Sequence, residues 1–266
     1  MPSVIKKTAG ETDTEIIIID NNSSDDSAGF LKKHCPENKI IFNKQNTGFA
    51  KACNQGFHVA SGKYILFLNP DTIVSGHCFE KCISFFESHH DAGAVGVRMI
   101  NEKGIFLKES KRGFPSPAAA FYKLFGLARF FPHSKIFSKY YMGYLHEKKN
   151  SPVDILSGAF MMIRKEVLVQ TGPFDESFFM YGEDIDLSYR IVQAGYKNFY
   201  LGEITITHIK GGSTQYDYNY IKRFYGAMNL FVKKHYAGKR SAIFVFALYT
   251  GIWFRKIIAV VSLLFR

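Results

Sequence analysis

The stretch Tyr64-Ile-Leu-Phe-Leu-Asn-Pro-Asp71 is an apolar segment that runs directly into a carboxylate. Residues 65–68 have the length and bulk of a strand buried on both faces, and Pro70 has no N–H to donate, so strand pairing should end there. We therefore expect Asp71 at the rim of a sheet, where open α/β sheets bind their ligands. A carboxylate there suits a divalent cation that bridges to a phosphate-bearing substrate. The same peptide is also typical of a turn that leads into a helix.

Strands and helices alternate on both sides of this stretch. The isoleucine run at 15–20 ends in Asp20 and is followed by turn-forming residues that predict the start of a capped helix. The alternation predicts an α/β fold, a mostly parallel sheet with helices on both faces. The other expected elements are strands at 39–43, 93–99, 153–164, 198–201 and 204–208, and helices at 47–60, after Gly76 and at 184–194. Residues 102–150 lack such periodicity, and we expect an irregular, basic and aromatic lid or acceptor region there.

Length and charge narrow the class of protein. The chain has 266 residues, 47% of them hydrophobic and 16% aromatic, which argues for a buried core and against global disorder. The net charge of +11 is uneven, because residues 201–266 hold ten Lys or Arg against Glu203 and Asp217. Such a basic tail suits nucleic acid, a phosphorylated ligand or an anionic membrane surface. We expect the membrane and no nucleic acid, because an apolar segment follows and no nucleic-acid-binding motif appears.

The apolar segment 241–266 is interrupted by the pair Arg255-Lys256. The apolar parts on either side are each too short to span a bilayer, and one spanning helix would place both cations near mid-membrane at a high cost. We therefore expect 216–266 to be a basic helical tail whose apolar part lies in the membrane interface. The alternative is a helix packed on its own domain or in an oligomer. No secretory signal is visible and the four cysteines have no CxxC spacing, which favours the cytoplasmic face of the membrane.

A second acidic site follows a run of large side chains in Phe178-Phe179-Met180-Tyr181-Gly182-Glu183-Asp184. Acids in the first turn of a helix are explained in part by the helix dipole. The preceding aromatic and Met side chains, however, look like the wall of a dry pocket, in which a carboxylate can become a general base. His208, at the end of a predicted strand and before Gly211-Gly212, is a possible metal ligand or phosphate contact, although a lone His is more often structural.

Together, six segments resemble the inverting glycosyltransferases of family 2, which have the GT-A fold, and most closely the rhamnosyltransferase-like branch. The segments are Ile-Ile-Ile-Ile-Asp-Asn-Asn-Ser-Ser-Asp (16–25), Asn-Thr-Gly-Phe-Ala-Lys-Ala-Cys-Asn-Gln-Gly (46–56), Leu-Asn-Pro-Asp-Thr (68–72), Gly-Ala-Phe-Met-Met-Ile-Arg (158–164), residues 172–190 around Tyr-Gly-Glu-Asp-Ile-Asp, and His-Ile-Lys-Gly-Gly-Ser (208–213). They occur in the family's order and cover roughly residues 15–215.

The resemblance implies a role for each matching residue. It implies Asp184 as the base that deprotonates the acceptor hydroxyl, with Glu183 beside it. It implies Mg²⁺ or Mn²⁺ on Asp71, with His208 completing the metal site. Nucleotide-sugar contacts are implied for Asp20, Gly48, Asn54 and Asn69. Asn69 stands where the family's Asp-x-Asp motif has its first acid.

The implied protein has a catalytic domain at 1–215 and the basic tail at 216–266. We expect it to transfer a sugar, rhamnose in this branch, from a nucleotide diphosphate sugar to a lipid-linked or polysaccharide acceptor in cell-surface glycan synthesis. The family places a further strand and helix before the Asp20 strand, so we expect a domain shortened at its N-terminus, with Met-Pro-Ser-Val-Ile-Lys-Lys as the tail of that helix. The alternative is a truncated, non-catalytic relative that binds at the membrane.

Overall fold

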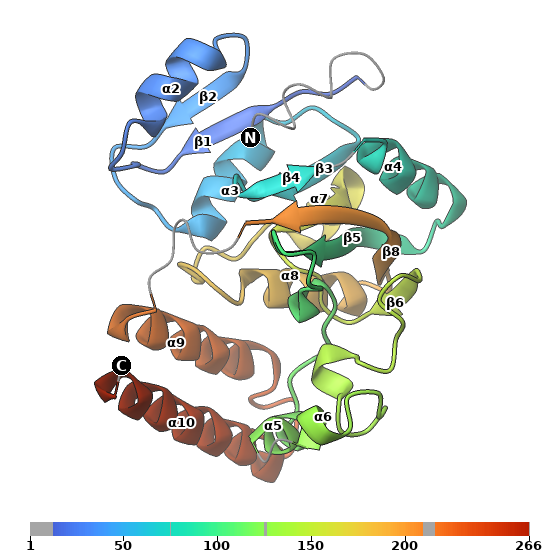
Figure 1. Ribbon diagram of the computed structural model, residues 1–266, viewed down its shortest axis with the longest axis vertical. Helices are drawn as coiled ribbons and strands as arrows, with labels where there is room; N and C mark the ends of the chain where they lie inside the picture. Colours follow the sequence, from blue (N-terminus) through green and yellow to red (C-terminus); the bar gives the residue numbers. More distant parts are fainter. Residues whose placement is uncertain (1–12, 75, 125–126, 210–215, 266) are drawn as a thin grey trace.

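The computed structural model describes residues 13–74, 76–124, 127–209 and 216–265 (Figure 1). Its first half contains β1 (Ile17–Asp20), α2 (Ser27–His34), β2 (Lys39–Phe42), α3 (Phe49–Val59), β3 (Tyr64–Leu68), β4 (Thr72–Val74), α4 (Cys78–Ser88), β5 (Ala92–Ile100) and η1 (Lys108–Ser110). Its second half contains α5 (Pro117–Leu124), α6 (Leu127–Phe130), η2 (Lys139–Tyr141), β6 (Ser151–Val153), β7 (Phe160–Arg164), α7 (Lys165–Thr171), α8 (Glu183–Gln193), β8 (Lys197–His208), α9 (Tyr218–His235) and α10 (Ala242–Leu264).

The α/β class is confirmed, but the prediction of a mostly parallel sheet is wrong. The main sheet has the order β3-β7-β5-β8-β4, with β6 also paired to β8. Only β5 and β8 run parallel within it, and the pairs β3–β7, β5–β7, β4–β8 and β6–β8 are antiparallel. The reason is that β7 is reached through the long segment 101–159 rather than through a short helical crossover. A helical crossover favours a parallel neighbour, and a long irregular connection does not impose that direction.

β1 and β2 form a separate two-stranded parallel sheet. Within the described part of the chain, β1 pairs only with β2, and β3 pairs only with β7. Each of these two strands therefore has one edge without a partner strand. Residues 1–7, which we expect to be a helix tail, lie outside the described residues.

Helices cover both faces of the main sheet, as the sequence predicts. Side chains of β3 alternate between the two faces: Ile65 and Phe67 pack into a core with α3, α7 and α8, whereas Leu66 and Leu68 pack against the core that contains α4. β3 thus packs on both of its faces, as the apolar run at 64–68 predicts. This placement holds the carboxyl end of β3 against rigid elements on either side.

Three strand boundaries differ from the sequence prediction. The turn after Asp71 continues at once into β4, whose short apolar segment has its two outer residues buried. The strand expected at 153–164 is two strands, β6 and β7, separated by the segment around Ser157 and Gly158. The two strands expected after 197 are one, β8, with a shift of register against β5 between Leu201 and Thr205.

The C-terminal part is helical, and α10 is one continuous helix. It packs along α9 and against α5, at the opposite end of the molecule from β1 and β2 (Figure 1). Leu248 and its neighbours on one side of α10 are buried against α9, as the alternative of a packed helix predicts. By length and composition residues 242–263 are sufficient to cross a membrane, and most of this segment is not buried.

Candidate functional site

Asp71 and His208 are brought together by the pairing of β4 with β8. This pairing is antiparallel and places Thr72 opposite His208, so that Asp71, one residue earlier, lies beside the end of β8. His208 Nε2 lies 3.1 Å from Asp71 Oδ1. The two groups are close enough for an ion pair but are not oriented for a hydrogen bond, and Asp71 Oδ1 is buried without a hydrogen-bond partner among the residues that the structure describes. His208 Nδ1 and Asn69 Oδ1 are buried in the same unpartnered condition.

These atoms fit a divalent cation. A buried carboxylate oxygen, amide oxygen or imidazole nitrogen without a partner costs free energy unless a ligand satisfies it. Carboxylate and amide oxygens suit Mg²⁺ or Mn²⁺, and Mg²⁺ is usually held by one or two carboxylates together with substrate phosphates. The described residues contain no cluster of three or more His, Cys, Asp or Glu. Asp71 and His208, with Asn69, are thus the residues that would hold the metal.

Asp184 lies in the first turn of α8, where a sharp backbone turn places it. Tyr181 and Gly182 both have positive φ angles, +69° and +85°, and this turn directs the chain into the helix. Arg112 Nη2 donates a hydrogen bond of 2.6 Å to Asp184 Oδ2, and the Gly158 N–H donates one of 3.2 Å to the same oxygen. Phe178, before the turn, is fully buried. The carboxylate is therefore oriented by two hydrogen bonds, while Phe178 packs the preceding segment into the core with α9.

Glu183 has a different environment from its neighbour. Its side chain is buried and Oε2 has no hydrogen-bond partner in the described residues. Burial and, second, the charge of Asp184 raise the pKa of Glu183 to about 8. The guanidinium of Arg112 meanwhile compensates the charge of Asp184 directly. Near neutral pH Glu183 is accordingly the protonated member of the pair.

A short segment connects the two acidic sites. The Asn69 N–H donates to the carbonyl of Ala159 over 3.0 Å, while Gly158, one residue earlier, donates to Asp184. A Cβ atom at Gly158 would lie 3.5 Å from Asp184 Cβ and 3.7 Å from the ring of Phe49. The carboxyl end of β3 and the start of α8 therefore meet at the turn before β7, although 113 residues separate Asp71 from Asp184 in the sequence.

Gly48 and Asn54 contact the loop that precedes α8. Gly48 has φ +87°, and a Cβ there would lie 2.5 Å from the carbonyl oxygen of Phe179, which accepts a 2.8 Å hydrogen bond from Phe49 N–H. Asn54 is buried and exchanges hydrogen bonds of 2.8 and 3.1 Å with the backbone of Phe174. Both residues thus shape the site through this loop, and their contact with a nucleotide stays a prediction.

Asp20 is buried at the end of β1, where it accepts hydrogen bonds from the backbone and hydroxyl of Ser23.

The next residue, Asn21, was missed by the sequence reasoning, which assigned it to a turn. Its Oδ1 accepts from Asn43 Nδ2 and from the backbone and hydroxyl of Thr47, each at 3.0 Å, and its Nδ2 donates to the Gly48 carbonyl. An Asn directly after an apolar strand was the available signal. Asn21 fixes the approach to α3 relative to the end of β1.

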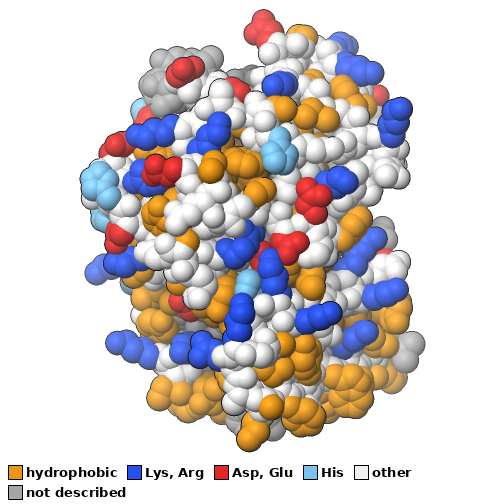
Figure 2. Space-filling view, turned by 180° about the vertical axis from the view of Figure 1, so that it is seen from behind, with side chains coloured by type: hydrophobic (Ala, Val, Ile, Leu, Met, Phe, Trp, Pro, Cys, Tyr) orange, Lys and Arg blue, Asp and Glu red, His pale blue; other side chains and the backbone are white. Residues whose placement is uncertain are grey.

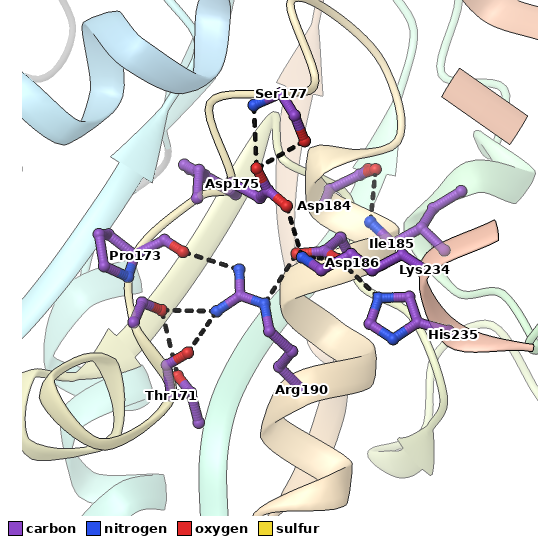
Figure 3. A network of polar contacts seen from close by, with 12 residues as sticks. Thr171, Pro173, Asp175, Ser177, Asp184, Ile185, Asp186, Arg190, Lys234 and His235 are labelled. Atoms are coloured by element: carbon purple, nitrogen blue, oxygen red, sulfur yellow. Dashed lines mark hydrogen bonds and ion pairs between the residues drawn. The ribbon is translucent and has the colours of Figure 1, made fainter. Parts of the chain in front are cut away.

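A buried ionic network behind α8 was also missed (Figure 3). Asp186 is fully buried; its Oδ1 accepts from Lys234 Nζ at 2.7 Å and lies 2.6 Å from His235 Nε2, and its Oδ2 accepts from Arg190 Nε at 2.7 Å. Lys234 also donates to Asp175. Burial opposes ionisation of Asp186, but the hydrogen bond from His235 and the charges of Arg190 and Lys234 outweigh it and lower its pKa to about 2. The network fastens α8 to α9 two residues after Asp184.

The structure therefore unites Asn69, Asp71 and His208 in one group and Glu183 and Asp184 in a second, joined through residues 158 and 159. Asp20 lies at the end of β1, in the separate sheet. Residues 210–213 of the predicted His-Ile-Lys-Gly-Gly-Ser segment lie outside the described residues. Arg112, from the region predicted as a lid, is the contact to Asp184 that the sequence did not indicate.

Comparison with known sequences identifies related proteins. The model of the family described as Glycosyl transferase family 2 matches residues 2–172. The minor teichoic acid biosynthesis protein GgaB of Bacillus subtilis is 37% identical over 90 residues, and the low-salt glycan biosynthesis hexosyltransferase Agl10 of Haloferax volcanii is 29% identical over 182 residues. These matches cover 33% and 66% of this chain, and the chain spans only 10% and 52% of the two relatives. The N-acetylglucosaminyl-diphospho-decaprenol L-rhamnosyltransferase of Mycobacterium tuberculosis is 26% identical over 220 residues, 79% of this chain and 71% of the relative.

Solved structures show the same fold. The mannosyltransferase PcManGT from Pyrobaculum calidifontis, in complex with GDP-Man and Mn²⁺, aligns with a TM-score of 0.58 over 98% of this chain and 69% of its own, at 13% identity. Residues 1–349 of Staphylococcus aureus TarS, in complex with UDP, align with a TM-score of 0.57 over 88% of this chain and 59% of that chain, at 16% identity. The mixed α/β architecture is therefore GT-A-like.

Proposed function

Because the chain belongs to glycosyltransferase family 2, we propose that it is an inverting glycosyltransferase acting in cell-surface glycan synthesis. The donor is a nucleotide diphosphate sugar, with rhamnose as the proposed sugar, and the acceptor is a lipid-linked or polysaccharide hydroxyl. The choice of rhamnose and of a lipid-linked acceptor is supported by the name of the mycobacterial relative. The proposal of a nucleotide donor is supported by the UDP and GDP-Man named for the two structural neighbours.

One observation carries this proposal: residues 158 and 159 contact both the group of Asn69, Asp71 and His208 and the carboxylate of Asp184. Asn69 N–H binds the Ala159 carbonyl, and Gly158 N–H binds Asp184. Glycosyl transfer needs an electrophilic group at the leaving diphosphate and a base at the acceptor hydroxyl. This segment joins groups suited to those two tasks within one site.

We assign the steps of the reaction to these residues. Asp184 accepts the proton of the acceptor hydroxyl, and the acceptor oxygen forms a bond to the anomeric carbon as the bond from that carbon to the diphosphate oxygen breaks, with inversion. Arg112 and Gly158 N–H hold the carboxylate in position for that proton. Asp71 and His208, with Asn69, are the residues that would hold Mg²⁺ or Mn²⁺, and such an ion would supply stabilisation of the negative charge on the departing nucleoside diphosphate.

We further propose that α10 holds the protein on the cytoplasmic face of the cell membrane. Its outward side is apolar and largely exposed, and no Asp or Glu follows Asp217 in the sequence. Such a helix suits an interfacial position on an anionic lipid surface. This position would place the domain beside a lipid-linked acceptor.

Two substitutions test the assignment of roles. In transfer assays with a nucleotide diphosphate-rhamnose, Mn²⁺ and a lipid-linked N-acetylglucosamine acceptor, we expect Asp184→Asn to lower kcat by about 10²–10⁴-fold, the usual contribution of a general base. Donor binding measured by calorimetry should be retained. Asp71→Ala should instead abolish the Mn²⁺-dependent part of donor binding. Asp91→Asn, which changes an exposed carboxylate paired with Lys197, is the matched control.

Turnover near the wild-type value in the Asp184 variant would overturn its role as base. Donor binding that keeps its dependence on Mn²⁺ in the Asp71 variant would overturn the metal assignment. Binding of donor without transfer by the unaltered chain would favour the non-catalytic alternative.

A further inference from the structure

A second apolar element lies at the end of the molecule that carries α10. Phe130 closes α6 and is 75% exposed, Phe131 follows it at 53%, and Ile136 is 61% exposed. α6 packs against α5, and α5 packs against α10. Residues 127–136 and the outward face of α10 therefore belong to one region of the surface, although more than 100 residues separate them in the sequence.

The outward face of α10 is an apolar stripe at helical spacing. Ile243, Phe246, Trp253, Ile257 and Val261 are exposed, with Phe246 at 72% and Trp253 at 62%, whereas the opposite side packs on α9. An exposed apolar stripe of this length marks a surface that binds a partner or a membrane. Figure 2 shows hydrophobic side chains gathered at this end of the molecule, with a band of Lys and Arg above them.

The charge of the surrounding chain indicates the partner. Residues 111–146 contain six Lys or Arg and no Asp or Glu, and residues 218–266 contain nine Lys or Arg and no Asp or Glu. Arg129, Lys135 and Lys139 are exposed beside the second apolar element, and Lys239 and Arg240 are exposed just before α10. An apolar surface bordered by cations alone is complementary to a bilayer that contains anionic lipids.

We propose that residues 127–136 are a second membrane-inserting element, which binds an anionic lipid bilayer together with α10. The proposal extends the membrane contact proposed for α10 and is independent of the sugar and of the catalytic residues. With two separate contacts, at residues 127–136 and at α10, the bilayer fixes the orientation of the domain as well as its distance from the membrane. The region predicted as a lid or acceptor region then touches the lipid at one end and, through Arg112, the base Asp184 at the other.

The single tryptophan of the chain, Trp253, permits a direct test on the full-length protein. Its emission should shift to the blue when phosphatidylcholine vesicles containing phosphatidylglycerol are added, and this shift reports on α10. For the second element, the chain Phe130→Trp/Trp253→Phe moves the reporter to residue 130. We expect a blue shift there too, with the same vesicles. The matched control is Val169→Trp/Trp253→Phe, because Val169 is 71% exposed on α7, away from this surface, and its emission should not change.

Affinity gives a second measurement. Phe130→Ser/Phe131→Ser should weaken co-sedimentation with these vesicles about tenfold or more, since each exposed Phe that enters lipid removes apolar surface from water. Val169→Ser should bind like the wild type. If the reporter at residue 130 stays in a water-like environment while Trp253 shifts, the second element is refuted and the α10 contact stands. If neither shifts, both are refuted. A stable dimer in the absence of lipid, seen by light scattering with both reporters already blue-shifted, would show that a second copy covers this surface and would also overturn the proposal.

Discussion

The buried network around Asp186 permits a quantitative prediction for Asp186→Asn. The side chain is fully buried, and its carboxylate contacts Arg190, Lys234 and His235. Its pKa is lowered from 3.8 to about 2. At 1.36 kcal/mol per pKa unit, this difference corresponds to about 2.4 kcal/mol of stabilisation by the ionised form.

The substitution removes the charge and keeps the shape. Arg190 retains hydrogen bonds to the carbonyls of Thr171, Gly172 and Pro173, and Lys234 retains Asp175. The cations are therefore not left wholly without partners, and the loss should fall at or below the 3–5 kcal/mol typical of breaking a buried ion pair. We expect the free energy of unfolding at neutral pH to fall by about 2–4 kcal/mol.

Chemical denaturation followed by circular dichroism at a series of pH values measures this loss. Since the folded-state pKa of Asp186 is lowered, its contribution is fully present above about pH 4 and is lost as the pH falls through about 2. The variant should lack this part of the acid dependence and approach the wild type at the lowest pH. Asp91→Asn is the control, because its ion pair with Lys197 is exposed and should be worth less than about 1 kcal/mol. If Asp186→Asn costs no more than this control, the network does not fasten α8 to α9.

Two further predictions concern the neighbours of Asp184. The pKa of Glu183 is raised to about 8, so between about pH 4.5 and about pH 8 the folded chain holds a proton that the unfolded chain has released. The free energy of unfolding should therefore fall with rising pH by up to about 1.4 kcal/mol per pH unit. Glu183→Gln should remove this slope in denaturation measured at about pH 5 and about pH 8, and an unchanged slope would contradict the argument that burial raises the pKa. Arg112→Met removes the cation whose 2.6 Å hydrogen bond holds the Asp184 carboxylate, so kcat should fall while donor binding measured by calorimetry is retained, and Arg112→Lys should restore part of kcat. A matching loss of donor binding and of the free energy of unfolding in both variants would indicate a purely structural role.

The parts of the fold that depend on local sequence were predictable. β1, β3 and β5 are apolar runs, and Pro70 marked the point where β3 pairing ends, so the place of Asp71 at a strand end followed directly. Strand direction was not predictable in the same way. It is decided by which strands pair, and β7 enters between β3 and β5 after a long irregular segment whose path no local pattern fixes.

The contacts of the site residues could not be predicted from local sequence either. His208 was a candidate from its strand end, but its approach to Asp71 depends on the short strand β4, which was interpreted as part of a turn. Lys234 and His235 lie in the basic run 233–235, which was interpreted as part of a membrane-directed tail. The helical phase carried the missing signal: His235 continues the buried face of α9 that includes Phe231 and Val232, and a polar side chain on a buried face requires a hydrogen-bond partner opposite it.

Asp184, the proposed base, lies between contacts that lead to both proposed membrane elements. On one side, α10 packs on α9, and α9 supplies Lys234 and His235 to Asp186, two residues along α8 from Asp184. On the other side, Arg112 contacts Asp184 and belongs to the region 102–150, which also contains residues 127–136. A contact with lipid at both elements would therefore act on α8, which carries Asp184, and on the region that supplies Arg112 to its carboxylate. A general base is effective only within hydrogen-bond reach of its proton donor, so the orientation of the domain on the bilayer and the alignment of Asp184 with a lipid-linked hydroxyl depend on the same contacts.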